Sequence, residues 1–139
     1  MTSLPTAYLL FNGSIVIMVG LVLGFPLRSA IIKKNGDMNA WRVAHSVLLM
    51  DGLLMLVVGL TLPYLSLDKR AIWLLVWSLV AAGYAFMVTF TVGAWKGIRG
   101  LTMKPFGLNT ILFAAHVIGA FGSLVGIAVA MFGYVKAIF

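Results

Sequence analysis

Hydrophobic residues fall into four long runs that are separated by short polar breaks. The runs cover residues 5–27, 41–65, 71–95 and 106–135, so they nearly fill the 139-residue chain. Each run reaches the length of about 20 apolar residues that a helix needs to cross a bilayer. The breaks are so short that consecutive helices must lie side by side and antiparallel. The pattern therefore predicts an all-α integral membrane protein, one domain over residues 1–139, with four transmembrane helices in an antiparallel up-down bundle.

Composition supports a lipid bilayer as the medium of this chain. Hydrophobic residues make up 63% of it and charged residues 9%, whereas a soluble domain carries roughly a quarter charged residues. So few charges cannot cover a water-soluble surface, which excludes a soluble enzyme. The absence of cysteine excludes thiolate metal sites and cysteine nucleophiles. We expect no nucleic-acid partner despite the net charge of +7, because no polar domain is available to present that charge.

The basic residues are divided unequally between the two sides of the predicted bundle. Basic residues are retained preferentially on the cytoplasmic side of a membrane protein. The larger group lies in or beside the first and third breaks and contains Arg28, Lys33, Lys34, Arg42, Lys96, Arg99 and Lys104. The smaller group contains Lys69, Arg70 and Lys136. We therefore expect a multi-pass protein of the bacterial inner membrane with the first and third breaks in the cytoplasm.

Three polar side chains fall deep inside the apolar runs. Asp51, Tyr84 and His116 lie at comparable depths if the helices are antiparallel. An ionisable group at such a depth costs several kcal/mol and usually marks a functional site. We therefore predict a mid-membrane cluster of these three residues. For His116 an interhelical hydrogen bond is an equally good explanation, and for Tyr84 simple packing is the better one.

The second run carries a histidine above two glycines on one helical face. His45, Gly52 and Gly59 are spaced by seven residues, which is nearly two full turns of a helix. Such a flat stripe below an imidazole suits a planar macrocycle held by His45, with Leu48 beside it. Close packing of another helix on the two glycines explains the same pattern, so both interpretations stay open.

Five short motifs connect this chain with a known family. They are Trp41-Arg42-Val43-Ala44-His45-Ser46, Asp51-Gly52, Leu62-Pro63, Asp68-Lys69 and Arg99-Gly100-Leu101-Thr102. In this order and spacing they resemble styrene oxide isomerase of bacterial styrene degradation, over roughly residues 41–134. The resemblance implies a homotrimeric membrane enzyme that binds heme b between neighbouring subunits. His45 matches the histidine that is the family's single axial ligand, so the resemblance implies that His45 ligates the heme iron.

The resemblance also implies a reaction and a set of residues that face the substrate. In that family ferric heme acts as a Lewis acid on an epoxide, the ring opens to a benzylic cation, a hydride migrates and an aldehyde is released. The family has a substrate-orienting asparagine where this chain has Asp51, and its active-site tyrosine falls opposite Phe90 or Thr89. Burial favours a protonated Asp51, which would donate a hydrogen bond as that asparagine would. An ionised Asp51 would instead stabilise a developing cation, with His116 or Tyr84 as its partner. His116 has no counterpart in the family.

The predicted cofactor site extends from His45 to the basic end of the bundle. Heme propionates need cations or water, because an unpaired buried carboxylate is costly. We expect Arg42 and one of Lys96, Arg99 or Lys104, from the same or a neighbouring subunit, to lie closest to them. The expected cofactor-binding residues are His45, Arg42, Gly52, Leu48 and Arg99, and the expected catalytic residues are Asp51, Tyr84, Phe90 and His116.

Two functions of other classes remain as alternatives. A small membrane cytochrome would transfer electrons through a heme held by both His45 and His116, although these residues differ in depth by roughly 9 Å. A proton-coupled exporter would use Asp51, but four-helix exporters rely on a glutamate in the first helix and this chain contains no glutamate.

Overall fold

The computed structural model describes residues 3–34, 37–104 and 106–139, and this part of the chain contains helices and no strands. Four helical segments in it are long and apolar enough to cross a membrane. They are Leu4–Lys33, Met38–Tyr64, Lys69–Lys96 and Leu108–Ile138. The structure thus confirms the predicted fold class of four membrane-spanning helices.

The first span consists of two helices that meet at a small break. Helix α1 (Leu4–Val22) is followed after Leu23 by α2 (Gly24–Lys33). Pro26 has no N–H to donate to the preceding turn, which favours an interruption at this place. Our prediction ended this span at Leu27, six residues too early. The helix continues through Arg28 because a helix is held by its backbone hydrogen bonds. An exposed charged side chain does not interrupt these bonds.

Aspartate side chains begin the next two spans. The Asp37 carboxylate accepts a hydrogen bond from the Ala40 N–H at 3.0 Å and caps α3 (Met38–Thr61). The Asp68 carboxylate accepts from the Ala71 N–H at 2.7 Å and caps α4 (Lys69–Lys96). Both helices therefore start two or three residues before the apolar runs from which we predicted them. The 3-10 turn η1 (Leu62–Tyr64), which contains Pro63, follows α3.

Helix α4 ends at a glycine, and the connection that follows leads into the last span. Gly97 adopts a left-handed conformation (φ 66°), and the Ile98 N–H donates to the Gly93 carbonyl at 2.9 Å. This is the usual way in which a glycine closes a helix. The last helix, α5 (Leu108–Ile138), starts after Gly107 and is the longest of the molecule.

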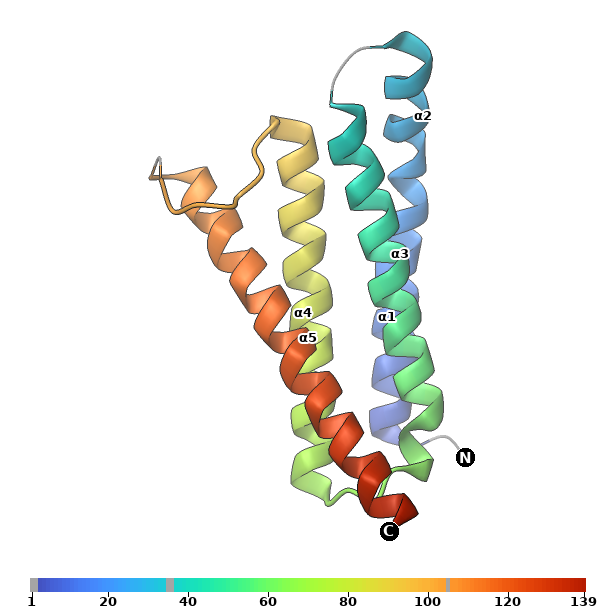
Figure 1. Ribbon diagram of the computed structural model, residues 1–139. Helices are drawn as coiled ribbons and strands as arrows, with labels where there is room; N and C mark the ends of the chain where they lie inside the picture. Colours follow the sequence, from blue (N-terminus) through green and yellow to red (C-terminus); the bar gives the residue numbers. More distant parts are fainter. Residues whose placement is uncertain (1–2, 35–36, 105) are drawn as a thin grey trace.

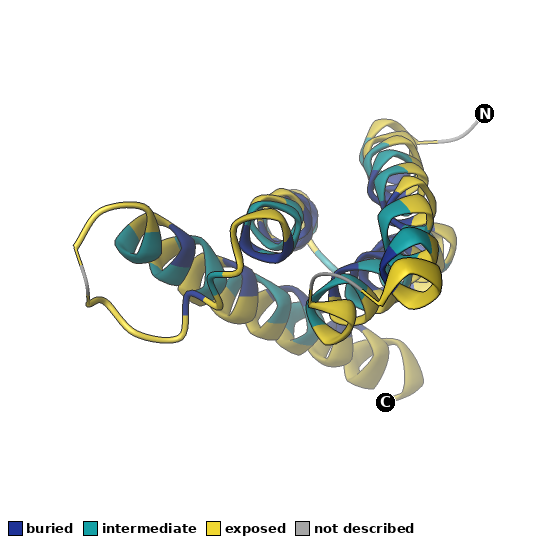
Figure 2. Cartoon of the chain, turned by 90° about the horizontal axis from the view of Figure 1, so that it is seen from above, coloured by how far each residue is buried: buried dark blue, intermediate teal, exposed yellow. Residues whose placement is uncertain are grey.

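The helices pack as two antiparallel pairs that meet through α3 and α4. Helix α1 lies along α3 and α5 lies along α4, while α1 also touches α4. Seen from above, the near end of α4 lies between the first turns of α5 and the other helices, and α5 then runs beneath α4 to the C-terminus (Figure 2). Helix α5 is tilted, so that its first turns lie far from α3 (Figure 1). The up-down order is as predicted, but α5 has its main contacts with α4 alone.

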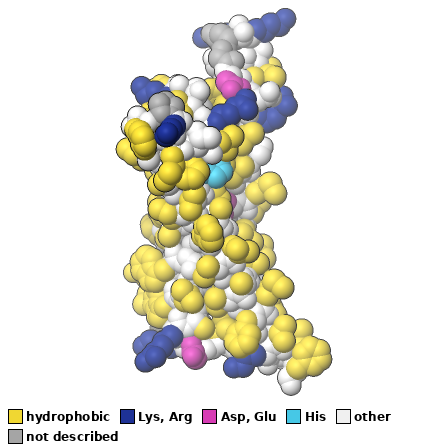
Figure 3. Space-filling model, turned by 60° about the vertical axis from the view of Figure 1, so that its left-hand side comes forward, with side chains coloured by type: hydrophobic (Ala, Val, Ile, Leu, Met, Phe, Trp, Pro, Cys, Tyr) yellow, Lys and Arg dark blue, Asp and Glu magenta, His cyan; other side chains and the backbone are white. Residues whose placement is uncertain are grey.

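The surface carries the signature of a membrane protein. Lys and Arg side chains gather at the two ends of the molecule, and the band between them is hydrophobic (Figure 3). The α2–α3 and α4–α5 connections lie at the same end (Figure 1). This arrangement agrees with the predicted division of the basic residues between the two sides.

Glycines bring α1 and α3 into close contact. A Cβ added to Gly52 would lie 2.5 Å from Ile17 Cγ1 and 2.8 Å from the Gly13 carbonyl oxygen, and one added to Gly59 would lie 3.0 Å from Leu9 Cβ. Helix α1 therefore fills the stripe below His45. The interpretation of Gly52 as the floor of a macrocycle site is wrong for this chain, and the helix-packing alternative is correct.

This contact leads to a prediction about stability. We expect Gly52→Ala to lower the free energy of unfolding by about 1–3 kcal/mol, because the new methyl group meets α1 backbone that cannot rotate away. Equilibrium unfolding in mixed micelles, followed by far-UV circular dichroism, measures this change. Gly24→Ala is the matched control, since its Cβ would meet its nearest neighbour, His45, at an ordinary 3.5 Å. Equal stabilities of the two variants would contradict the packing described here.

Candidate functional site

The position of His45 is set by a hydrogen bond across the α1–α3 contact. Its Nδ1 lies 2.7 Å from the Gly20 carbonyl oxygen. A carbonyl oxygen can only accept, so Nδ1 must carry the proton and donate it. In the neutral imidazole this leaves the lone pair on Nε2, which has no hydrogen-bond partner among the described residues. The half-buried ring is thus held in one tautomer with a free nitrogen that can ligate a metal.

The surroundings of His45 differ from the predicted cofactor cradle in one further respect. Leu48 is fully buried and packs at Gly20 on α1. It therefore belongs to the helix interface and is not available beside a macrocycle. Arg42 is exposed and lies about one turn from His45 toward the basic end of α3, as predicted.

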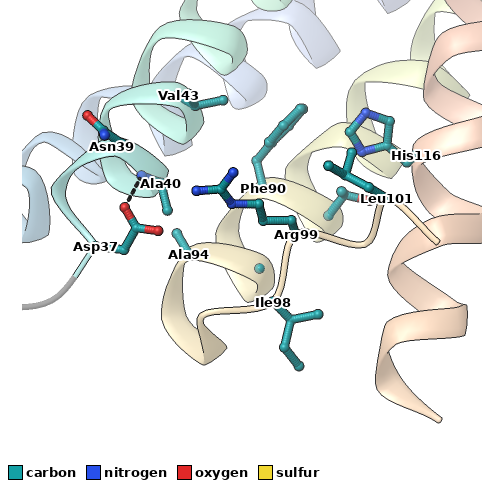
Figure 4. A pocket seen from close by; sticks show the side chains of 12 residues that line it. Asp37, Asn39, Ala40, Val43, Phe90, Ala94, Ile98, Arg99, Leu101 and His116 are labelled. Atoms are coloured by element: carbon teal, nitrogen blue, oxygen red, sulfur yellow. Dashed lines mark hydrogen bonds between the residues drawn. The ribbon is translucent and has the colours of Figure 1, made fainter. Parts of the chain in front are cut away.

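A cavity of about 350 Å³ lies on another side of α3, near the basic end of the molecule. It is open to the outside, and its wall is mostly apolar (Figure 4). Val43 lines it and His45 does not, since two residues turn a helix by about 200°. The residues of the wall are Asp37, Asn39, Ala40, Val43, Thr89, Phe90, Gly93, Ala94, Ile98, Arg99, Leu101 and His116.

His116 enters this cavity from α5 between two phenylalanine rings. Its ring centroid lies 5.3 Å from that of Phe90 and 6.0 Å from that of Phe86, both in edge-on contacts. Phe86 lies flat on Gly119, where an added Cβ would overlap its ring. The His116 Nδ1 is buried and has no hydrogen-bond partner among the described residues. The structure does not show the interhelical hydrogen bond that was our alternative explanation of His116.

The two positions that fall opposite the family's tyrosine have different surroundings. The buried Thr89 hydroxyl donates to the Leu112 carbonyl on α5 at 3.2 Å, so it holds α4 and α5 together. Phe90 lines the cavity and contacts His116 (Figure 4). Phe90 is thus the residue of this pair with a ring in the cavity, and it has no hydroxyl.

Arg99 belongs to the cavity and not to the surroundings of His45. It reaches from the α4–α5 connection across the mouth of the cavity (Figure 4). This connection is held on α5 by the Asn109 side chain, which donates to the Thr102 and Lys104 carbonyls, and by Thr110, which donates to the Met103 carbonyl. Within one chain, Arg99 and His45 lie on different sides of α3, so Arg99 would reach a heme at His45 only from a neighbouring subunit, as the prediction allows.

Asp51 is buried where α1, α3 and α4 meet. It is 8% exposed, and its Oδ2 has no hydrogen-bond partner among the described residues. The same atom lies 3.0 Å from the place where a Gly83 Cβ would be. His116 contacts Phe86 and Phe90, which follow Gly83 by about one and two turns of α4. The predicted cluster of Asp51 with His116 is wrong. Asp51 lies against α4 at Gly83, whereas His116 of α5 contacts α4 nearer to its basic end, so the two side chains do not meet.

Tyr84 also lies outside that cluster. Its hydroxyl donates to the Asn12 side-chain oxygen on α1 at 2.9 Å, in an exposed position. The depth predicted for Tyr84 is right, since its neighbour Gly83 lies against Asp51, but the side chain turns toward α1. The Asn12 partner was missed, although a polar residue within the first apolar run was the available signal. No pattern in the sequence announced the contact of Phe86 with His116.

The hydrogen bond of Tyr84 predicts a structural role. We expect Tyr84→Phe to lower the free energy of unfolding by about 0.5–1.5 kcal/mol, the typical value of one hydrogen bond. Any turnover of the protein should stay within about twofold, because the hydroxyl points away from both His45 and the cavity. Chemical denaturation and an activity assay on the same preparation check this, with Asn12→Ala as the partner variant. A loss of activity without a loss of stability would restore a catalytic role.

A comparison with protein families matches residues 6–135 to styrene oxide isomerase. A comparison with curated proteins gives no match. The family match covers nearly all of the chain and includes every residue of the site described above. It agrees with the short motifs around His45 and Arg99 that carry the resemblance in the sequence. The chain therefore belongs to the styrene oxide isomerase family.

Proposed function

We propose that this protein is a heme b-dependent isomerase of the bacterial inner membrane that converts an epoxide, similar to styrene oxide, into an aldehyde. The family match supports isomerase chemistry on an epoxide. The four apolar spans support a site that takes its substrate from the lipid phase. Such a substrate is apolar and accumulates in the bilayer, so a membrane enzyme meets it at high concentration.

The hydrogen bond between His45 and Gly20 is the observation that carries the heme proposal. Histidines that ligate a metal usually donate their second ring nitrogen to a carbonyl or carboxylate, which fixes the ring and its tautomer. His45 has this arrangement, because its Nδ1 donates to the Gly20 carbonyl and its Nε2 has no hydrogen-bond partner among the described residues. His45 would thus hold the heme iron through Nε2, and ferric heme bound there would supply a Lewis acid for the epoxide oxygen.

Two arginines near His45 fit the carboxylates of such a cofactor. Arg42 lies on α3 about one turn from His45, on the side of the basic end. Gly24 of α2 lies against the His45 ring, and Arg28 follows Gly24 by one turn toward the same end. Both arginines are exposed. They would offset the charge of two propionates at the membrane surface.

We also propose a homotrimer in which the complete site lies between neighbouring subunits. In one chain, His45 and the cavity lie on different sides of α3. A heme held by His45 would therefore not face the cavity of the same chain. A neighbouring subunit can bring its own cavity to the His45 side. The exposed side of α3 next to His45 is apolar over most of its length, as a contact between subunits in a membrane requires.

The absorption spectrum of the purified, heme-loaded protein tests this function. A single axial histidine predicts a five-coordinate ferric spectrum that changes when styrene oxide is added, together with formation of phenylacetaldehyde. The cytochrome alternative requires a six-coordinate low-spin spectrum. The structure already disfavours that alternative, because His45 is held against α1 whereas His116 lies between two rings of α4. A protein that purifies with no heme and binds none would overturn the proposal.

A further inference from the structure

We propose that the cavity between α3, α4 and α5 binds the neutral aryl epoxide and its aldehyde product, and that the His116 Nε2–H donates a hydrogen bond to their oxygen. This inference rests on the proposed function for the identity of the substrate. It assigns to the cavity a ligand class, and to His116 a role in binding and specificity.

The size and wall of the cavity fit a small apolar molecule. Its volume of about 350 Å³ is at the lower end of the roughly 300–1,000 Å³ that small-molecule sites occupy. Ala40, Val43, Phe90, Ala94 and Leu101 make most of the wall apolar. The Phe90 ring offers a face or an edge to an aromatic ligand. A compound with one ring and one short polar group therefore fits better than a charged metabolite.

The charged groups of the cavity lie at its mouth. Asp37 already accepts a hydrogen bond from the α3 N-terminus, and both Asp37 and Arg99 are exposed. Thr89 also lines the wall, but its hydroxyl donates its hydrogen bond to the Leu112 carbonyl. Asn39 is exposed as well, so His116 is the polar side chain of the wall that remains for a ligand in the interior of the cavity.

The state of the His116 ring follows from its surroundings. Nδ1 is enclosed without a partner, whereas Nε2 is not enclosed in this way. A buried N–H without an acceptor costs more than a buried lone pair, so the proton belongs on Nε2. The contacts with Phe86 and Phe90 hold the ring plane. An epoxide or aldehyde oxygen, which can only accept, accepts the hydrogen bond of the Nε2–H, and the enclosed Nδ1 keeps its lone pair.

Nuclear magnetic resonance of the histidine rings tests this proposal directly. The chain contains two histidines, so 15N-histidine labelling of the full-length protein in detergent, loaded with the diamagnetic gallium analogue of heme, gives two ring systems that iron does not broaden. The probes are acetophenone, which has an accepting oxygen, and ethylbenzene, which has a similar shape without one. We expect a saturable shift of the His116 Nε2 resonance with acetophenone and no comparable shift with ethylbenzene.

Two variants separate the hydrogen bond from packing. His116→Phe keeps an aromatic ring beside Phe86 and Phe90 and should weaken acetophenone binding about three- to tenfold, as the loss of one hydrogen bond predicts. Its affinity for ethylbenzene should stay within twofold. His116→Asn retains a donor and should keep acetophenone affinity within threefold. Equal losses for both probes in either variant, or an unshifted His116 resonance, would overturn the proposal.

A parallel sample with ferric heme shows whether the proposed function itself has failed. Ferric heme ligated by His45 broadens the His45 resonances beyond detection, with or without acetophenone. If the His45 signal is unchanged by heme, the heme proposal is wrong, whatever happens at His116. If His45 responds to heme and His116 ignores acetophenone, the error lies in the ligand assigned to the cavity.

Discussion

Replacement of His45 with alanine is expected to lower the affinity for heme by more than about 100-fold. Loss of an outer partner of a metal ligand already costs 10- to 100-fold in metal affinity, and loss of the ligand itself should cost more. The structure offers no substitute, because the other histidine of the chain lies between Phe86 and Phe90 on the far side of α3. The heme content of the purified protein, measured as the pyridine hemochrome, gives the result.

The matched control for this prediction is His116→Ala. It removes an imidazole from the same membrane-embedded region and should leave the heme content unchanged. The helix content of both variants, followed by circular dichroism, shows that neither has unfolded. A His45→Ala protein that purifies with full heme would show that the axial ligand has been assigned to the wrong residue.

Asp51→Leu is expected to lower the turnover of an aryl epoxide by about 10²- to 10³-fold while heme binding stays unchanged. Asp51 does not line the cavity, so this expectation follows from its match to the substrate-orienting asparagine of the family. Removing one donor that stabilises developing charge in a reaction usually costs this much. Asp51 has a buried oxygen with no partner among the described residues, and such a costly arrangement is typical of functional positions in membranes. Steady-state rates at saturating epoxide measure the effect.

Asp51→Asn separates the two ways in which this side chain could act. It keeps a hydrogen-bond donor of the same shape and restores the residue that the resemblance predicts at this position. Turnover should be retained or raised if Asp51 acts as a neutral donor. If Asp51→Leu has wild-type turnover, the side chain has no part in the chemistry and is a structural residue of the α1–α3–α4 contact.

Helix positions were predictable because apolar runs of this length have few alternatives in a membrane. The true helix starts could also have been read from Asp37 and Asp68, whose side chains cap α3 and α4. The extension of the first span through Arg28 to Lys33 was missed. Hydropathy records where the bilayer ends, whereas a helix continues until its backbone hydrogen bonds are interrupted.

The candidate site was only partly predictable, because it depends on which helices meet. Periodicity correctly placed His45 and Gly52 on one face of α3. It could not identify α1 as the helix that covers that face. The depth of Asp51 relative to Tyr84 was also right. The direction of the Tyr84 side chain was not, since it depends on Asn12, which lies 72 residues away in the sequence. Phe90 and His116 meet only because α5 leans against the end of α4.

A deuterium label followed through the reaction tests the heme-dependent isomerisation most directly. Styrene oxide with two deuterium atoms on its terminal carbon is incubated with the heme-loaded protein, and the product is analysed by mass spectrometry and NMR. A hydride shift in the heme-loaded protein predicts phenylacetaldehyde with one deuterium on each of its two side-chain carbons, and heme-free protein should form no product. Formation of a diol, loss of label to water, or equal activity without heme would contradict it.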